Sequence, residues 1–265
     1  MLPSTKRTVV PALRLRVFAG PNGSGKSTVI NAVKQYTANG RPIDFGYYIN
    51  ADDIAAQLRE NGCPFDQFDI TVTNNAFASI AIDSGLINQD FTEAQFFKCY
   101  ILRSNTIKLK VKGADERLAQ IIADFLRKTL LLEKKRFSFE TVFSHESKLD
   151  IMRKAADAGY KVYLYFVSTE LPEINKYRVD LRVRKGGHYV DPLKIESRYY
   201  RSLELLYQAC QLSYSVFFFD NSKDNEPFKM FANFKKNISG KKWERTADLP
   251  EWFKKYYLKK IKSPK

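Results

Sequence analysis

A glycine-rich stretch near the N-terminus, GPNGSGKST from Gly20 to Thr28, has the residue types and spacing of a phosphate-binding loop. In this Walker A pattern the glycines let backbone N–H groups face a phosphate, the lysine reaches the β- and γ-phosphates, and the hydroxyl after it binds Mg²⁺. The lysine is Lys26, and Ser27 supplies the predicted metal ligand. The sequence therefore predicts a nucleoside triphosphate site formed by Gly20, Asn22, Gly23, Ser24, Gly25, Lys26, Ser27 and Thr28.

Two acids, Asp52 and Asp53, follow a short predicted strand over 46–50. The carboxyl ends of parallel strands form the edge of the sheet where ligands bind. We therefore predict that Asp52 is a general base that accepts a hydroxyl proton near the γ-phosphate. The alternative is that both acids only cap the helix expected over 51–60, as aspartates commonly do.

A second acid lies at the end of another predicted strand, FSFE over 137–140, where Glu140 precedes Thr141. A carboxylate and a hydroxyl at this edge can orient a substrate hydroxyl or a metal-bound water. The alternative is an ordinary turn at a strand end. We expect Glu140 and Thr141 to share a cleft with Asp52.

Arginines are concentrated in a predicted helical hairpin over 170–213, which is interrupted by Gly186 and Gly187. Arginines delivered by a closing lid neutralise the charge of a transferring phosphoryl group and shut out water, which favours transfer over hydrolysis. For Arg184 and Arg201 a solvated helix face is the simpler role, and we interpret His188 as shaping the lid. The arginines of the hairpin are at 178, 182, 184, 198 and 201.

These residues must be positioned by an alternation of strands and helices, which predicts an α/β fold of the P-loop NTPase type. We expect three αβα layers around a five-stranded, mainly parallel sheet with a helical lid hairpin. The predicted domain covers 1–222, with an insertion at about 60–113 and a basic C-terminal appendage over 223–265 that packs on it. The predicted strands cover 13–19, 46–50, 137–140, 161–168 and 215–220.

The amino-acid composition further narrows the class of protein. Three cysteines and two histidines in 265 residues support neither a disulfide framework nor a zinc cluster. The longest apolar runs are strand-sized, so we expect a soluble, cytoplasmic protein without a membrane partner.

The net charge of +15 raises the question of nucleic acid. From Phe228 onward twelve Lys or Arg stand against three acids, with Trp243 and Trp252 between them. Two interpretations remain open, a nucleic-acid surface and a solvated helix face whose aromatic residues pack on the domain, of which we favour the second.

The ordered series GPNGSGKS, INADDIA, FSFET, RVDLRVRKGGHYV with Asn175 before it, RYYRSL and FFFDNS resembles the zeta-toxin-like P-loop kinases. The resemblance spans Leu13 to roughly Ser222, apart from much of the insertion. It implies that Lys26 and Ser27 hold ATP and Mg²⁺, that Asp52 is the general base and that Glu140 and Thr141 bind substrate. The resemblance also implies that Arg182 and Arg198 are catalytic arginines of the lid and that Arg178 contacts the substrate. It further implies that the turn after Asp220 lies near the adenine, so that Asp220 is not a Walker B acid.

The best-known members of that family phosphorylate UDP-N-acetylglucosamine, and a small antitoxin blocks their ATP site. The insertion after Asp53 lies where the acceptor pocket would be built, so the sugar nucleotide is not carried over. We predict a small-molecule kinase with an alcohol group as acceptor. The alternatives are a nucleic-acid-associated P-loop NTPase or polynucleotide-end kinase, and a regulatory ATP-binding module.

Overall fold

The computed structural model describes residues 12–224, 226–238 and 240–262. Residues 1–11 of the predicted domain, and 225, 239 and 263–265 of the predicted appendage, lie outside the described residues.

Five parallel strands form the centre of the main sheet, in the order β10-β9-β1-β8-β4. They are rich in aromatic and β-branched residues, and β9 is apolar on both faces, as strands covered by helices on both sides are. The predicted parallel core is therefore confirmed. The strands are β1 (Arg14–Ala19), β4 (Tyr47–Ile49), β8 (Phe137–Thr141), β9 (Lys161–Ser168) and β10 (Ser215–Asp220).

The sheet has seven strands rather than five, because part of the basic C-terminal stretch joins it. Strands β11 (Lys229–Asn237) and β12 (Gly240–Arg245) continue the sheet antiparallel beyond β10. The favoured prediction of a helix face is wrong for these residues, because they form strands. Its aromatic residues do pack on the domain, since Phe231 and Phe234 on β11 are buried and the Trp243 ring on β12 lies 4.7 Å from that of Phe234.

The chain ends in helical turns that cover this extension, α10 (Glu251–Phe253), a π-helical turn (Lys254–Leu258) and α11 (Lys259–Lys262). Trp252, Phe253 and Tyr257 are almost fully buried. Aromatic side chains in that state are not available to stack on bases, so the nucleic-acid interpretation loses its aromatic component.

Alternation along the central strand divides the core between two faces of the sheet. On β1, Leu15 and Val17 pack with helices α5, α6 and α9, while Phe18 packs with Val29 and Ile30 of α1 on the other face. Helices on both faces confirm the three-layer architecture. The helices named here are α1 (Lys26–Gln35), α5 (Asp115–Leu132), α6 (Ser147–Asp157) and α9 (Leu206–Leu212).

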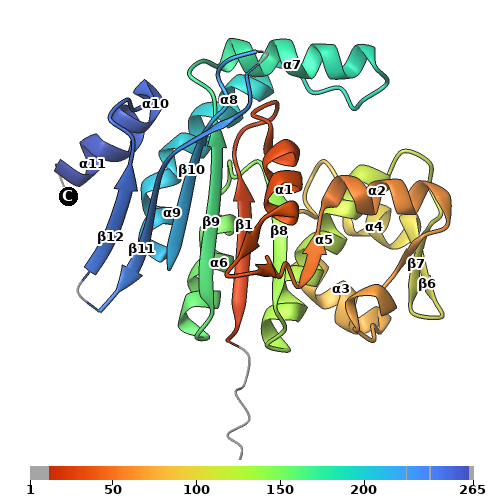
Figure 1. Ribbon diagram of the computed structural model, residues 1–265. Helices are drawn as coiled ribbons and strands as arrows, with labels where there is room; N and C mark the ends of the chain where they lie inside the picture. Colours follow the sequence, from red (N-terminus) through yellow and green to blue (C-terminus); the bar gives the residue numbers. More distant parts are fainter. Residues whose placement is uncertain (1–11, 225, 239, 263–265) are drawn as a thin grey trace, which may run out of the picture.

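The insertion forms a small unit beside helix α2 (Ala51–Glu60), on the right of Figure 1. Its three strands pair in the order β5-β7-β6, and β6 and β7 form a hairpin. The ring of Phe77 lies 5.3 Å from that of Phe125, which anchors the unit on α5. Its elements are β5 (Cys63–Pro64), a 3₁₀ turn (Asp66–Phe68), α3 (Asn74–Ile82), α4 (Glu93–Cys99), β6 (Tyr100–Arg103) and β7 (Thr106–Leu109).

The predicted lid hairpin consists of α7 (Pro172–Arg184) and α8 (Pro192–Glu204), which lie across the carboxyl end of the sheet at the top of Figure 1. A two-stranded ribbon, β2 (Thr37–Ala38) and β3 (Arg41–Pro42), follows α1. Across the described residues, every helix is too short or too polar to span a bilayer.

Candidate active site

The glycine-rich loop joins β1 to α1 and takes a conformation that depends on two of its glycines. Gly23 and Gly25 have φ of 74° and 93°. A Cβ on Gly23 would lie 2.6 Å from the Asn175 carbonyl oxygen, and one on Gly25 would lie 2.2 Å from the Asn221 amide nitrogen. Only glycine fits both positions, because they combine a left-handed backbone with close neighbours.

The start of α1 offers free donors toward the cleft. No side chain caps this helix, and within the described ranges the backbone N–H groups of Lys26 and Ser27 have no acceptor. Both residues line the cleft. Unpaired N–H groups at a helix N-terminus attract anions, so the loop fits a phosphate chain.

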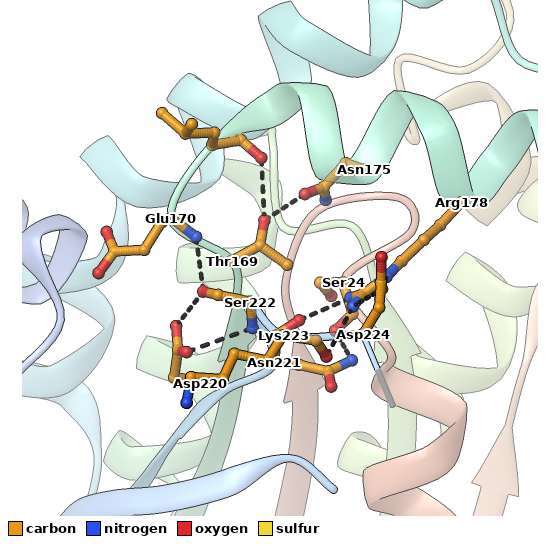
Figure 2. Close-up of polar contacts among 11 residues, drawn as sticks. Ser24, Thr169, Glu170, Asn175, Arg178, Asp220, Asn221, Ser222, Lys223 and Asp224 are labelled. Carbon is orange, nitrogen blue, oxygen red and sulfur yellow. Dashed lines mark hydrogen bonds and ion pairs between the residues drawn. The ribbon is translucent and has the colours of Figure 1, made fainter. Parts of the chain in front are cut away.

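Two asparagines brace the loop from outside (Figure 2). Asn175, fully buried on α7, donates to the Asn22 carbonyl oxygen at 2.5 Å, and its own oxygen accepts from the Thr169 hydroxyl. Asn221, just after β10, donates to the Ser24 carbonyl oxygen at 2.9 Å. The motif in which Asn175 precedes the lid arginines does not by itself predict this role.

Lys26 is buried at the base of the cleft. Its ammonium donates to the Pro21 carbonyl oxygen at 3.0 Å and lies 3.8 Å from Oε1 of Glu140. Burial lowers the pKa of Lys26, while the charges of Glu140 and Asp52 act in the opposite direction. An ammonium with a single hydrogen bond in such a place retains donors for phosphate oxygens.

Glu140 is held from the neighbouring strand. Its Oε2 accepts from the Tyr48 hydroxyl at 3.3 Å and from the Asn50 amide at 3.4 Å. Burial and the Glu140 charge raise the pKa of Tyr48, which keeps that phenol a donor. Thr141 also lines the cleft, and its hydroxyl accepts from the Phe143 N–H at 3.1 Å.

Asp52 lies in the first turn of α2, but it is not the helix cap. That role belongs to Asn50, whose side chain accepts from the Asp52 N–H at 2.9 Å. Asp52 lines the cleft and Asp53 does not. Burial and the Asp52 charge raise the pKa of Asp53. Of the two acids, Asp52 alone is placed to act on a ligand in the cleft, and its role as base stays a prediction.

The lid brings two of the predicted arginines to the cleft. Arg198 donates to Oδ1 of Asn22 at 3.4 Å, and Arg182 donates to the His188 carbonyl oxygen at 3.3 Å. Both line the cleft, and both charges lower the pKa of Lys26. The charge of Lys26 is therefore influenced by two arginines of the lid and by two acids at the edge of the sheet.

Arg178 has a different environment from the one expected of a substrate ligand. It borders the cleft, but its guanidinium donates to the Asn221 carbonyl oxygen at 2.6 Å and to the Asp224 carboxylate at 2.7 Å (Figure 2). These contacts fasten α7 to the turn after β10. Arg184 forms an exposed pair with Asp180 at 2.8 Å, as expected for a solvated position.

Asp220 has no contact with the phosphate-binding loop among the interactions of the described residues. It accepts from Ser222 at 2.8 Å and from the Trp252 indole at 2.9 Å. These bonds tie the last parallel strand to the C-terminal helix, which fits a structural acid better than a Walker B acid.

The cleft is continuous and large, about 1480 Å³. It runs from the loop past Glu140 to the facing sides of α5 and α6. The lid bridges it, since Nδ1 of His188 lies 3.5 Å from Oε1 of Glu116 on α5. The insertion adds Ser84, Gly85 and Leu86 to its wall.

Sheet, loop and lid together define a P-loop α/β fold. One chain of the crystal structure of AvrRxo1-ORF1:AvrRxo1-ORF2 with sulphate ions matches with a TM-score of 0.51 over 92% of this chain, at 16% identity. At that identity the match shows a common fold and nothing finer. This chain spans 63% of that chain's length.

Other comparisons are weaker. The PezAT toxin–antitoxin system of Streptococcus pneumoniae matches at a TM-score of 0.44 and 11% identity, covering 82% of this chain and 70% of that one, which is too low to carry an argument. An uncharacterized protein of Haemophilus influenzae is 29% identical over 105 residues, 37% of this chain and 74% of its own. No protein-family model matches the sequence.

Proposed function

We propose that this chain is an ATP-dependent small-molecule kinase of the zeta-toxin type, which transfers the γ-phosphate to a hydroxyl of its acceptor. The observation that carries the proposal is that acids and arginines surround one buried lysine in the same cleft. The Lys26 ammonium lies 3.8 Å from Oε1 of Glu140, and Asp52, Arg182 and Arg198 line the cleft with it. A P-loop that only held a nucleotide would not need acids and lid arginines in the same cleft.

Each of these groups has a role in the proposed transfer. Asp52 takes the proton of the acceptor hydroxyl, and Glu140 with Thr141 positions that acceptor. Lys26, Arg182 and Arg198 stabilise the charge on the transferring phosphoryl group.

Magnesium fits the same site through its oxygen donors. Within the described ranges no cluster of three or more His, Cys, Asp or Glu could hold a metal ion. Ser27, an exposed residue that lines the cleft and follows the Walker A lysine, would hold Mg²⁺ together with phosphate oxygens. When bound, the ion neutralises phosphate charge.

The proposed function has two further parts, a protein partner and a cellular location. The AvrRxo1 structure contains ORF1 together with ORF2, and we propose that this chain also has a protein partner, a small antitoxin that blocks its ATP site. The three described cysteines are buried and free, in keeping with a cytoplasmic location. Toxicity on expression that Lys26→Ala abolishes would support the toxin role, and toxicity that persists would contradict it.

The kinase proposal is tested with γ-labelled ATP and a panel of sugar nucleotides, nucleosides and nucleotide cofactors, with UDP-N-acetylglucosamine included. We expect one labelled product that depends on Mg²⁺ and is absent with Lys26→Ala. Binding of oligonucleotides that weakens steeply with salt, with no labelled small molecule, would instead favour the nucleic-acid alternative.

A further inference from the structure

The end of the cleft farthest along α5 is a polar recess that the proposed phosphoryl transfer does not use. Gln120, Asp124 and Arg127 lie on one face of α5, three to four residues apart, and line the cleft. Opposite them, Ser147 and Lys148 begin α6 and line it too.

Positive charge is in excess in this recess. Asp124 pairs with Arg127 at 3.1 Å and with Lys128 at 2.8 Å, so its carboxylate already serves two cations. Lys148 is the third cation in this electrostatic group. Within the described parts of the chain its ammonium has no hydrogen-bond acceptor and no ion pair. Three cations thus share one carboxylate.

The orientation of Arg127 is fixed. It is 6% exposed, and its guanidinium lies 5.3 Å from the centre of the Phe139 ring. Lys148 is half-buried and lines the cleft. Burial lowers the pKa of Lys148 to about 7, and Arg127 adds to the effect.

A partly buried ammonium without a partner, close to an ion-paired guanidinium, is costly for the fold. A long apolar side chain at position 148 would fill the same space without that cost. The recess therefore has the excess positive charge that would hold an anion.

We propose that Lys148 and Arg127 form an anion subsite, which binds a phosphate or carboxylate group carried by the acceptor. The acceptor role rests on the kinase function proposed above, whereas the anion subsite itself does not. The ligand class is a small molecule with both a hydroxyl and a compact anionic group. Its anion lies between α5 and α6, and its hydroxyl lies toward Asp52 and Glu140.

The test uses sulfate, because its charge does not change near neutral pH. The full chain is labelled with ¹³C at lysine Cε and saturated with Mg²⁺ and a non-hydrolysable ATP analogue, so that the phosphate-binding loop is filled. The NMR signal that disappears in Lys148→Met is assigned to Lys148. We expect sulfate to shift this signal saturably and to raise the pKa of Lys148. Sulfate should bind more weakly as pH rises from 6 to 8, because Lys148 loses its proton.

The other charged groups around Lys148 are Arg127, Lys128 and Asp124, and the His145 ring lines the same recess. His145→Gln should keep the pH dependence, which separates Lys148 from the imidazole. Arg127→Gln should weaken sulfate binding about tenfold or more, whereas Lys154→Gln, on the exposed side of α6, should not change it.

The proposal is overturned if sulfate leaves the Lys148 signal unchanged at concentrations that saturate the empty loop of the nucleotide-free protein. If Lys148→Met fails to fold, Lys148→Arg gives the same assignment, because it removes the lysine signal and keeps the cation. Because no turnover is involved, a negative result leaves the kinase proposal intact. A positive result with no phosphoryl transfer would leave an anion subsite without an acceptor role.

Discussion

Buried polar residues hold the phosphate-binding loop in its shape before any ligand arrives. Asn175 is 0% exposed and connects the lid helix to the loop through the Asn22 carbonyl oxygen, while it pairs with Thr169 on its other side. Asn221 supports the loop from the last parallel strand. A loop fixed by such bonds presents its N–H groups without losing further conformational entropy on binding, which favours affinity.

Asn175→Ala tests this support. The change leaves the Asn22 carbonyl oxygen and the Thr169 hydroxyl without their partner, and we expect it to lower the free energy of unfolding by about 1–3 kcal/mol. Nucleotide affinity should fall as well. Urea unfolding and binding of a fluorescent ATP analogue measure the two effects.

The matched control is Asn75→Ala, an exposed position in the first turn of α3, which should change stability by no more than about 0.5 kcal/mol. Equal unfolding midpoints for the two variants would show that Asn175 does not support the loop.

In the proposed kinase, the lid is the element that distinguishes phosphoryl transfer from simple nucleotide binding. Helix α7 is fastened to the turn after β10 by Arg178, and α8 reaches the loop through Arg198. Between the two helices, His188 reaches across to Glu116 on α5. The lid is thus tied to both walls of the cleft, which favours exclusion of water during transfer.

Arg182→Met and Arg184→Met form a matched pair on this lid, because both residues belong to the last turn of α7. Arg182 lines the cleft, while Arg184 makes only an exposed pair with Asp180. We expect Arg182→Met to lower kcat by about 10²–10³, the loss seen on removal of a group that stabilises transition-state charge. Steady-state kinetics with the labelled acceptor should show no comparable loss for Arg184→Met, and equal losses in both variants would contradict the assignment.

The elements that carry the loop and the acids could be predicted from the sequence, because each has a local signal. Walker A glycines, alternating apolar strands and acids at strand ends act over a few residues, and the structure has those strands and helices where we expected them. The neighbours of each group depend on the fold instead. Arg178 fits a lid arginine by spacing, yet Asp224 and the Asn221 carbonyl occupy its donors.

The recess at Lys148 could not be predicted for the same reason. On α5 the polar residues Gln120, Asp124 and Arg127 recur at helical spacing within an otherwise apolar helix, which was the available signal. Nothing in the sequence states that the start of α6 faces them. The C-terminal strands were missed because lysines stand among aromatic residues there without regular alternation, and we interpreted this composition as a helix face.

The C-terminal stretch is part of the hydrophobic core of the molecule. Phe218, on the last parallel strand, contacts Trp243 of β12 and Phe253 of α10, with ring centres 6.1 Å and 4.8 Å away. The indole of Trp252 is tied to Asp220. Strands β11 and β12 therefore belong to the folding unit of the sheet, and their lysines protect an edge that would otherwise pair with other chains.

Trp252→Ala tests this integration. Trp252 is 2% exposed, and its loss should lower the free energy of unfolding by about 3–5 kcal/mol, as for other large aromatic residues in a core. Ile238→Ala, at an exposed position in the turn between β11 and β12, should be neutral to within about 0.5 kcal/mol. Thermal or urea unfolding compares them. A small effect at Trp252 would show that the C-terminal stretch is a dispensable appendage.

The central claim is that the cleft transfers phosphate to a hydroxyl with Asp52 as the base. The most direct measurement is ³¹P NMR of ATP turnover, with Mg²⁺ and the acceptor found in the labelled panel, for the wild type, Asp52→Asn and Asp53→Asn. We predict a new phosphomonoester signal that grows with ADP in the wild type and in Asp53→Asn, and about 10²–10⁴-fold more slowly in Asp52→Asn. Growth at the wild-type rate in Asp52→Asn, or inorganic phosphate as the wild type's sole product, would contradict the claim.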